Sequence, residues 1–211
     1  MDTLAYIMDK YHLDPNARSP IEIPNTGRDI LAVLFDELEF NIGAEIGVQE
    51  GIYSEVLCKA NPYLHLYSID PWRVYEGYRD HTSQEGLDRI YAEAVHRLFP
   101  YHCTILRKTS MEALGDFADK SLDFVYVDAN HEIPWAIEDI WWAVKKVRSG
   151  GIVAGHDYFE SKVLDTKMHV KYAVHCAVQS YRVNPWFLLG EKIAKEGDIR
   201  DDARSWFWVA R

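Results

Sequence analysis

Several short segments of the sequence place ionisable side chains directly after apolar runs. They are Glu45-Ile46-Gly47, Ile69-Asp70, Val127-Asp128 and Ala154-Gly155-His156-Asp157. This pattern is typical of buried strands that end at the rim of a parallel sheet, where ligands bind. Neighbouring parallel strands lie roughly 4.8 Å apart, so Asp128 and Asp157 would face each other if their strands are adjacent. Two close carboxylates share a proton or bind a cation, and oxygen ligands suit Mg²⁺, Ca²⁺ or Mn²⁺. The alternative is that each carboxylate only caps the turn that follows it.

His131 lies three residues after Asp128, just above the predicted strand end. Imidazole is the side chain best suited to remove a proton near neutral pH. The chain has nine histidines, and position alone distinguishes His131 from the others. The role of His156 stays open, because it could bind a metal, orient a ligand or pack as a polar residue.

The segment 45–54 has the pattern E-x-G-x-x-x-G and predicts a strand, a tight turn and the start of a helix. Asp70, nineteen residues after Gly51, ends the next strand, where a carboxylate can accept hydrogen bonds from ribose hydroxyls. The spacing differs from the dinucleotide fingerprint, and Glu50 at the helix start would repel a pyrophosphate. A cationic nucleoside without phosphate suits this turn better, and S-adenosylmethionine is such a ligand.

The elements that must position these residues alternate between strand and helix from residue 41 onward. This alternation predicts an α/β fold with a single Rossmann-like, doubly wound sheet of seven strands. We expect the strands in the spatial order 103–107, 66–70, the strand ending at Gly47, 124–128, 152–154, 205–210 and 186–189, with 205–210 antiparallel. A helix over 135–147 is expected to stop at Gly150-Gly151.

The N-terminal segment has helical apolar spacing over 1–12 and 28–40, with Pro15, Pro20 and Pro24 indicating a loop between them. We expect residues 1–40 to form a helical cap or lid and residues 41–211 to form the cofactor-binding domain.

Composition limits the partners. The chain has 211 residues, enough for one domain, and a net charge of −10, which argues against nucleic acid or an anionic membrane as the main partner. The three cysteines form no C-x-x-C motif, and the first residues lack the features of a signal peptide. We therefore expect a cytoplasmic protein, with a homo-oligomer left open.

The motifs resemble those of the class I S-adenosylmethionine-dependent methyltransferases over about residues 41–211. E-I-G-V-Q-E-G-I-Y-S at 45–54 is similar to the first motif of catechol O-methyltransferases. Three further segments resemble the macrocin O-methyltransferase and cephalosporin-hydroxylase-like branch: Y-S-I-D-P-W at 67–72, F-V-Y-V-D-A-N-H at 124–131 and G-G-I-V-A-G-H-D-Y at 150–158.

The resemblance implies a role for each matching residue. Glu45, Gly47 and Gly51 would shape the cofactor turn, with Gln49 and Ser54 near the methionine end, Asp70 on the ribose, and Ser110 and Met111 beside the adenine. Asp128 and Asp157 match metal-binding acids, and His131 matches a catalytic base. Asp128 is also expected to take part in catalysis and to contact the cofactor. The chain departs from the pattern at His156, where related enzymes often have an acid, and at Tyr158, which replaces an amide.

We therefore expect an O-methyltransferase that acts on a hydroxylated small molecule or sugar. We expect Asp128, Asp157 and His156 to hold a divalent ion, with Mg²⁺ as the first candidate. The ion would lower the pKa of the acceptor hydroxyl, and His131 would remove the proton of that hydroxyl. Segments 1–12, 28–40 and 71–83 would cover the site. The alternatives are a metal-independent O- or N-methyltransferase and a non-catalytic subunit that binds S-adenosylmethionine. A nicotinamide dehydrogenase is disfavoured by the glycine spacing.

Overall fold

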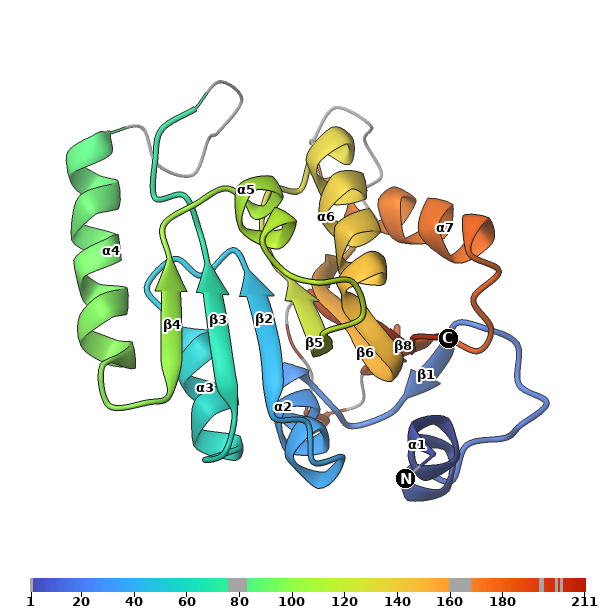
Figure 1. Cartoon of the computed structure of the whole chain (residues 1–211). Coiled ribbons are helices and arrows are strands. Elements are labelled where there is room, and N and C mark those ends of the chain that lie inside the picture. The colour runs from blue at the N-terminus through green and yellow to red at the C-terminus, as the bar shows by residue number, and fades with distance from the viewer. Residues whose placement is uncertain (1, 76–82, 160–167, 194–195, 200, 202) are drawn as a thin grey trace.

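A single eight-stranded sheet organises the chain in the computed structural model (Figure 1). The structure describes residues 2–75, 83–159, 168–193, 196–199, 201 and 203–211. The strands are β1 (Ile21–Ile23), β2 (Ile42–Ile46), β3 (His65–Ile69), β4 (Cys103–Leu106), β5 (Leu122–Val127), β6 (Val147–Tyr158), β7 (Phe187–Leu189) and β8 (Arg204–Val209). The helices are α1 (Thr3–Lys10), α2 (Arg28–Glu37), α3 (Ile52–Ala60), α4 (Gln84–Leu98), α5 (Ser110–Gly115), α6 (Ile133–Lys146) and α7 (Val170–Ser180).

The strand order is β1-β7-β8-β6-β5-β2-β3-β4, and only β8 runs antiparallel to its neighbours. The predicted order of seven strands is confirmed, but the predicted number was one too small. The additional strand is β1, which lies in the segment predicted to be a loop and pairs in parallel with β7 at the edge of the sheet. Three residues between prolines are too few to show an alternating pattern, so the sequence gives no strand signal there.

The sheet is covered on both faces, as a doubly wound fold requires (Figure 1). Successive residues of β5 point to opposite faces: Val125 and Val127 pack with α5, α6 and α7, whereas Phe124 and Tyr126 pack with α1, α2 and α3. Phe35 of α2 stacks on Phe124 with 4.0 Å between ring centroids. The N-terminal helices therefore share the core of the sheet, and the lid function predicted for residues 1–40 stays a prediction.

The connection from α6 to β6 differs from the prediction. The helix ends at Lys146 and β6 begins at once with Val147, so Gly150 and Gly151 lie inside the strand and do not terminate the helix. A Cβ atom at Gly151 would lie 2.3 Å from the backbone oxygen of Asp123, so only glycine allows this approach of the chain to β5. The glycine pair therefore allows β6 to lie close to β5. In the sequence, a glycine pair of this kind looks the same as one that terminates a helix.

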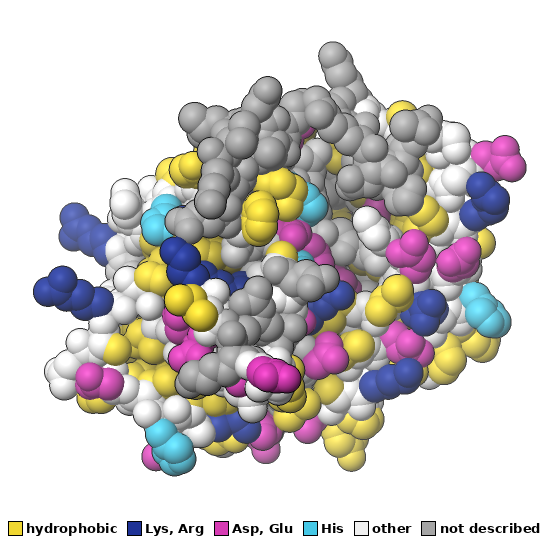
Figure 2. Space-filling model, turned by 180° about the vertical axis from the view of Figure 1, so that it is seen from behind, with side chains coloured by type: hydrophobic (Ala, Val, Ile, Leu, Met, Phe, Trp, Pro, Cys, Tyr) yellow, Lys and Arg dark blue, Asp and Glu magenta, His cyan; other side chains and the backbone are white. Residues whose placement is uncertain are grey.

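The described surface agrees with the acidic composition. On the face shown in Figure 2, basic side chains are interspersed with acidic and apolar ones. None of the helices in the described ranges has the length and apolar character needed to cross a membrane. Most of the segment 71–83, which was predicted to help cover the site, lies outside the described residues, because these omit 76–82.

Candidate active site

The glycine turn after β2 lies against the end of β5. Gly47 and Gly51 have positive φ angles of 85° and 77°, which residues with a side chain rarely adopt. A Cβ atom at Gly47 would lie 2.1 Å from the backbone oxygen of Asp128. The Asp70 carboxylate accepts hydrogen bonds from the backbone N–H groups of Val48 (2.9 Å) and Gln49 (3.1 Å). Asp70 therefore holds the turn in the open conformation that leaves space above the strand ends.

Trp72 fixes the same turn from the loop after β3. Its side chain is buried, and its backbone has an unusual positive φ of 38°. Its backbone N–H donates to Asp70 (2.8 Å), and its indole N–H donates to the carbonyl of Gln49 (3.0 Å). Its own carbonyl accepts from Gln84 (2.9 Å) and Arg107 (3.0 Å). Through its indole and its backbone, Trp72 thus joins the turn, α4 and the segment after β4.

Three residues predicted to bind the cofactor lie behind the turn and do not line the cavity in front of it. Glu45 and Ser54 are buried and hydrogen-bonded to each other, and the Ser54 hydroxyl is 2.7 Å from that of Ser68. Burial raises the pKa of the Glu45 carboxyl well above its usual value. Gly51 packs against Leu98 of α4. These residues support the turn from inside the protein.

A cavity of about 270 Å³ lies over the ends of β2, β3 and β5. Six residues predicted for the cofactor line it: Gly47, Gln49, Asp70, Ser110, Met111 and Asp128. Trp72 and Tyr75, from the segment 71–83 that was expected to cover the site, also line it. Sequence reasoning did not single out two further lining residues, Trp135 and Asp139. The Asn130 amide donates to the Tyr75 hydroxyl (3.1 Å), which joins the segment before α6 to the loop after β3.

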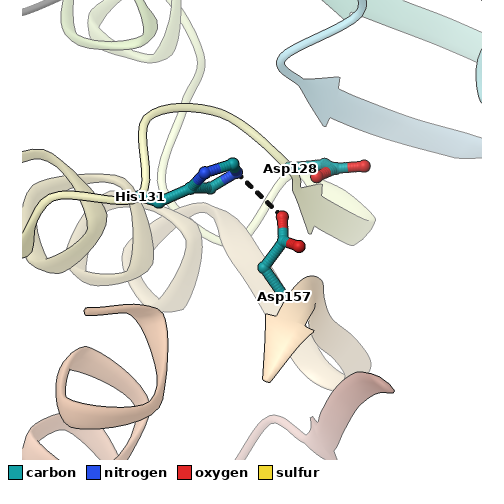
Figure 3. A group of neighbouring side chains, drawn as sticks. All are labelled: Asp128, His131 and Asp157. Atoms are coloured by element: carbon teal, nitrogen blue, oxygen red, sulfur yellow. Dashed lines mark ion pairs between the residues drawn. The ribbon is translucent and has the colours of Figure 1, made fainter. Parts of the chain in front are cut away.

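Asp128, His131 and Asp157 meet at the edge of this cavity (Figure 3). Asp128 follows β5, and Asp157 lies near the end of β6. The two strands are parallel neighbours, which is the arrangement needed for the two acids to face each other. His131 Nε2 lies 2.8 Å from Asp157 Oδ2. The cluster predicted from the strand ends is therefore present, with the imidazole paired to one of its carboxylates.

The two carboxylates differ in electrostatic environment. Burial and the neighbouring Asp157 raise the pKa of Asp128 to about 6. Burial alone would also raise the pKa of Asp157, but hydrogen bonds from His131 and His156 outweigh it and hold that pKa well below its usual value. Asp157 is therefore the fixed anion of the cluster, and Asp128 is the carboxylate more easily protonated.

His156 lies between the two acids. Its Nδ1 is 3.8 Å from Asp128 Oδ1 and 3.5 Å from Asp157 Oδ1, and the carboxylates raise its pKa although burial lowers it. Its Nε2 is buried and has no hydrogen-bond partner among the described residues. The side chain faces both acids, which is compatible with the predicted ligand role and with a charge-balancing role.

Arg28, at the start of α2, is a cation in the site that sequence reasoning missed. Its guanidinium lies 3.3 Å from Asp128 Oδ2 and 5.0 Å from the ring centroid of Tyr53. Its backbone N–H donates to Asp201 (2.8 Å), which occupies the end of the helix. A positive side chain in the first turn of a helix interacts unfavourably with the helix dipole. The position of Arg28 in the sequence was therefore a signal that it pairs with an acidic residue elsewhere in the fold.

The donor set fits a small divalent cation. Asp128, His131 and Asp157 can each offer one atom, and these atoms all lie within 4.8 Å of one another. Two carboxylates and one imidazole are compatible with Mg²⁺ or Mn²⁺ coordination. This group includes His131 where the sequence predicted His156, and Arg28 competes for one oxygen of Asp128.

A doubly wound sheet with a glycine turn, an acid at the next strand end and a cavity between them is typical of α/β proteins that bind nucleosides. Residues 44–158, more than half of the chain, match the family described as methyltransferase domain, and the chain therefore belongs to this family. The prediction of a methyltransferase is confirmed. Among curated proteins, none matches the sequence significantly.

Solved structures of methyltransferases have the same fold. The O-methyltransferase from Bacillus cereus, in complex with SAH, is 14% identical with a TM-score of 0.62, covering 99% of this chain and 91% of its own. TomG from Streptomyces achromogenes, an O-methyltransferase of tomaymycin synthesis in complex with SAM, is 18% identical with a TM-score of 0.61, covering 100% and 91%. The N-methyltransferase NodS from Bradyrhizobium japonicum is 14% identical with a TM-score of 0.56, covering 87% and 94%. At these identities the likeness shows the fold alone.

Proposed function

We propose that the protein transfers a methyl group from S-adenosylmethionine to a hydroxyl group of a small molecule, such as a phenol or a sugar. The observation that carries the proposal is one continuous site: the cavity over Gly47 and Asp70 reaches Asp128, which lies beside His131 and Asp157. A donor in the cavity and an acceptor above the cluster would meet at Asp128.

The donor side of the proposal rests on the cavity lining. Asp70 offers carboxylate oxygens at the end of β3, where ribose hydroxyls can donate to them, and the turn at Gly47 leaves room for a ligand backbone. The similar O-methyltransferase structures with SAH and SAM support the same donor here. The activated methyl needs alignment more than further activation, so a fixed turn is the main requirement on this side.

The acceptor side rests on the pair of His131 and Asp157. The neutral imidazole removes the proton of the acceptor hydroxyl, and the Asp157 carboxylate 2.8 Å away stabilises the imidazolium that results. Arg28, 3.3 Å from Asp128 Oδ2, favours the ionised form of this carboxyl group and so opposes the burial that raises its pKa. Together these residues give the acceptor oxygen its negative charge at the moment of transfer.

A divalent cation would be held by Asp128 and Asp157 with His156, which faces both acids, as the third ligand, so that His131 stays available as the base. When bound, the cation would lower the pKa of the acceptor hydroxyl. We further propose that the protein belongs to the macrocin-like branch of methyltransferases, that it is cytoplasmic and that residues 1–40 form a lid over the site.

Calorimetric titration with S-adenosylhomocysteine tests the donor. We expect binding with a Kd in the micromolar range, and no binding of NADH. If S-adenosylhomocysteine does not bind at tens of micromolar, the methyltransferase proposal fails, because the product of the donor must fit the same cavity.

Mn²⁺ titration followed by electron paramagnetic resonance tests the metal separately from turnover. We expect wild-type protein to bind Mn²⁺, Asp128→Asn to lose this binding, and the matched surface variant Asp116→Asn to keep it. In an assay of methyl transfer to a panel of phenols and sugars, EDTA should abolish activity. Activity that persists in EDTA would show a metal-independent methyltransferase.

A further inference from the structure

Asp139 is a buried carboxyl group that the proposed mechanism does not use. It lies on α6 with only 3% of its surface exposed, and it nevertheless lines the cofactor cavity. The Ser110 side chain is its hydrogen-bond partner, and burial raises the pKa of the Asp139 carboxyl to about 7. A buried carboxyl group at the wall of a cavity is costly unless a ligand gives it a hydrogen-bond donor.

The order of residues along the cavity indicates which part of the ligand lies nearest to Asp139. The sulfur that carries the methyl must lie toward Asp128, because the acceptor cluster is there. The ribose then falls at Asp70, at the end of β3. The base is left with the region bounded by Ser110, Met111 and Asp139, on α5 and α6.

An ionised carboxylate only accepts hydrogen bonds, so it discriminates between purines by the group at position 6. Adenine presents an amino group there, which donates, whereas hypoxanthine presents an oxygen, which repels the carboxylate. We propose that Asp139, held in place by the Ser110 hydroxyl, selects the adenine base of the cofactor by accepting a hydrogen bond from its 6-amino group. This inference rests on the proposed function, since it assumes a nucleoside donor in this cavity.

The test compares two ligands that differ at position 6. Full-length protein is titrated at pH 8, above the pKa of about 7, with S-adenosylhomocysteine and with S-inosylhomocysteine. We expect wild-type protein to prefer the adenosyl ligand by about 10-fold or more. In Asp139→Asn the amide can donate to the 6-oxygen, so the preference should disappear or reverse. The control is Asp116→Asn, the same substitution at an exposed acid outside the cavity, and it should keep the wild-type preference.

The outcomes separate the inference from the proposed function. If wild-type protein binds neither ligand, the proposed function fails. If wild-type protein binds both equally, the inference is overturned while the function stands, and this result does not depend on how well a variant folds. If Asp139→Asn weakens both ligands by the same factor, Asp139 has only a structural role and the inference is also overturned.

Discussion

Asp70 both holds the glycine turn and lines the cavity. Its carboxylate accepts from the N–H groups of Val48, Gln49 and Trp72, and it also lines the cavity where the ribose is proposed to bind. A ligand hydroxyl would therefore meet an oxygen whose direction is already fixed by the backbone. This geometry lowers the entropy lost on binding, because the acceptor does not have to be ordered by the ligand.

Replacement of Asp70 tests this double role. We expect Asp70→Ala to raise the Kd for S-adenosylhomocysteine by about 30-fold, because it removes the ribose acceptor and three bonds that hold the turn. Asp70→Asn keeps one acceptor oxygen and should lose less affinity. Calorimetry measures both, with Glu85→Gln on the surface of α4 as control. Unchanged affinity in Asp70→Ala would contradict the ribose assignment.

His131 can be separated from the cofactor site in the same way. We expect His131→Asn to lower kcat by about 100-fold or more, because general-base catalysis is lost, while the Kd for S-adenosylhomocysteine stays as in wild type. The control is His96→Asn on the exposed face of α4. Steady-state kinetics with an acceptor found in the panel assay gives kcat. A variant that retains full kcat would remove His131 from the mechanism.

Among the elements, the loop after β3 is the one whose conformation most depends on a single side chain. Trp72 has a backbone φ of 38° that is unfavourable for a bulky residue, and its indole and backbone bonds offset this cost. A strained conformation at a binding site keeps the turn in one shape before the ligand arrives.

Trp72→Phe removes the indole N–H that holds the carbonyl of Gln49 while keeping an aromatic ring. We expect S-adenosylhomocysteine to bind about 10-fold more weakly, with KM for S-adenosylmethionine raised and kcat little changed, because the turn is less ordered. Trp141→Phe on α6, which is 48% exposed, is the matched control. Equal affinity in the two variants would show that the indole bond does not order the turn.

The elements also show what the sequence could predict. Apolar runs followed by acids were enough to place Asp128 and Asp157 on neighbouring strands, because parallel strands share one carboxyl edge. Arg28 and Asp139 come from helices, and the direction of a helical side chain toward a distant strand depends on packing that periodicity does not encode. Glu45 and Ser54 carry the right motif, yet they lie behind the turn, because the motif specifies the turn and not which side faces the ligand.

For the whole molecule, Asp139 links the cofactor site to the stability of the fold. Its pKa is 3.8 in the absence of burial and about 7 in the folded protein, because burial and then Glu138 disfavour the charged form, although Ser110 opposes them. The folded state therefore holds this proton more tightly than the unfolded state. The stabilisation is fully present below pH 3.8 and is lost as the pH rises through about 7.

This linkage predicts a pH-dependent difference between wild type and Asp139→Asn, which does not ionise there. Between pH 5 and pH 8 the free energy of unfolding of wild type should fall by about 3 kcal/mol relative to the variant. Urea unfolding of both proteins at the two pH values measures it. Parallel stability curves would show that Asp139 does not bind a proton on folding.

The contacts of Arg28 have a consequence for the synthesis of the protein. Arg28 reaches Asp128, a hundred positions later in the sequence, and its helix is held by Asp201. A ribosome therefore makes the N-terminal helix long before it makes the residues that fix it over the strand ends. In a chain still being translated, Arg28 can meet Asp128 once residue 128 has emerged, but the start of α2 lacks its contact with Asp201 until residue 201 has emerged. The start of α2 is thus fixed by Asp201 only after every described strand except β8 has been synthesised.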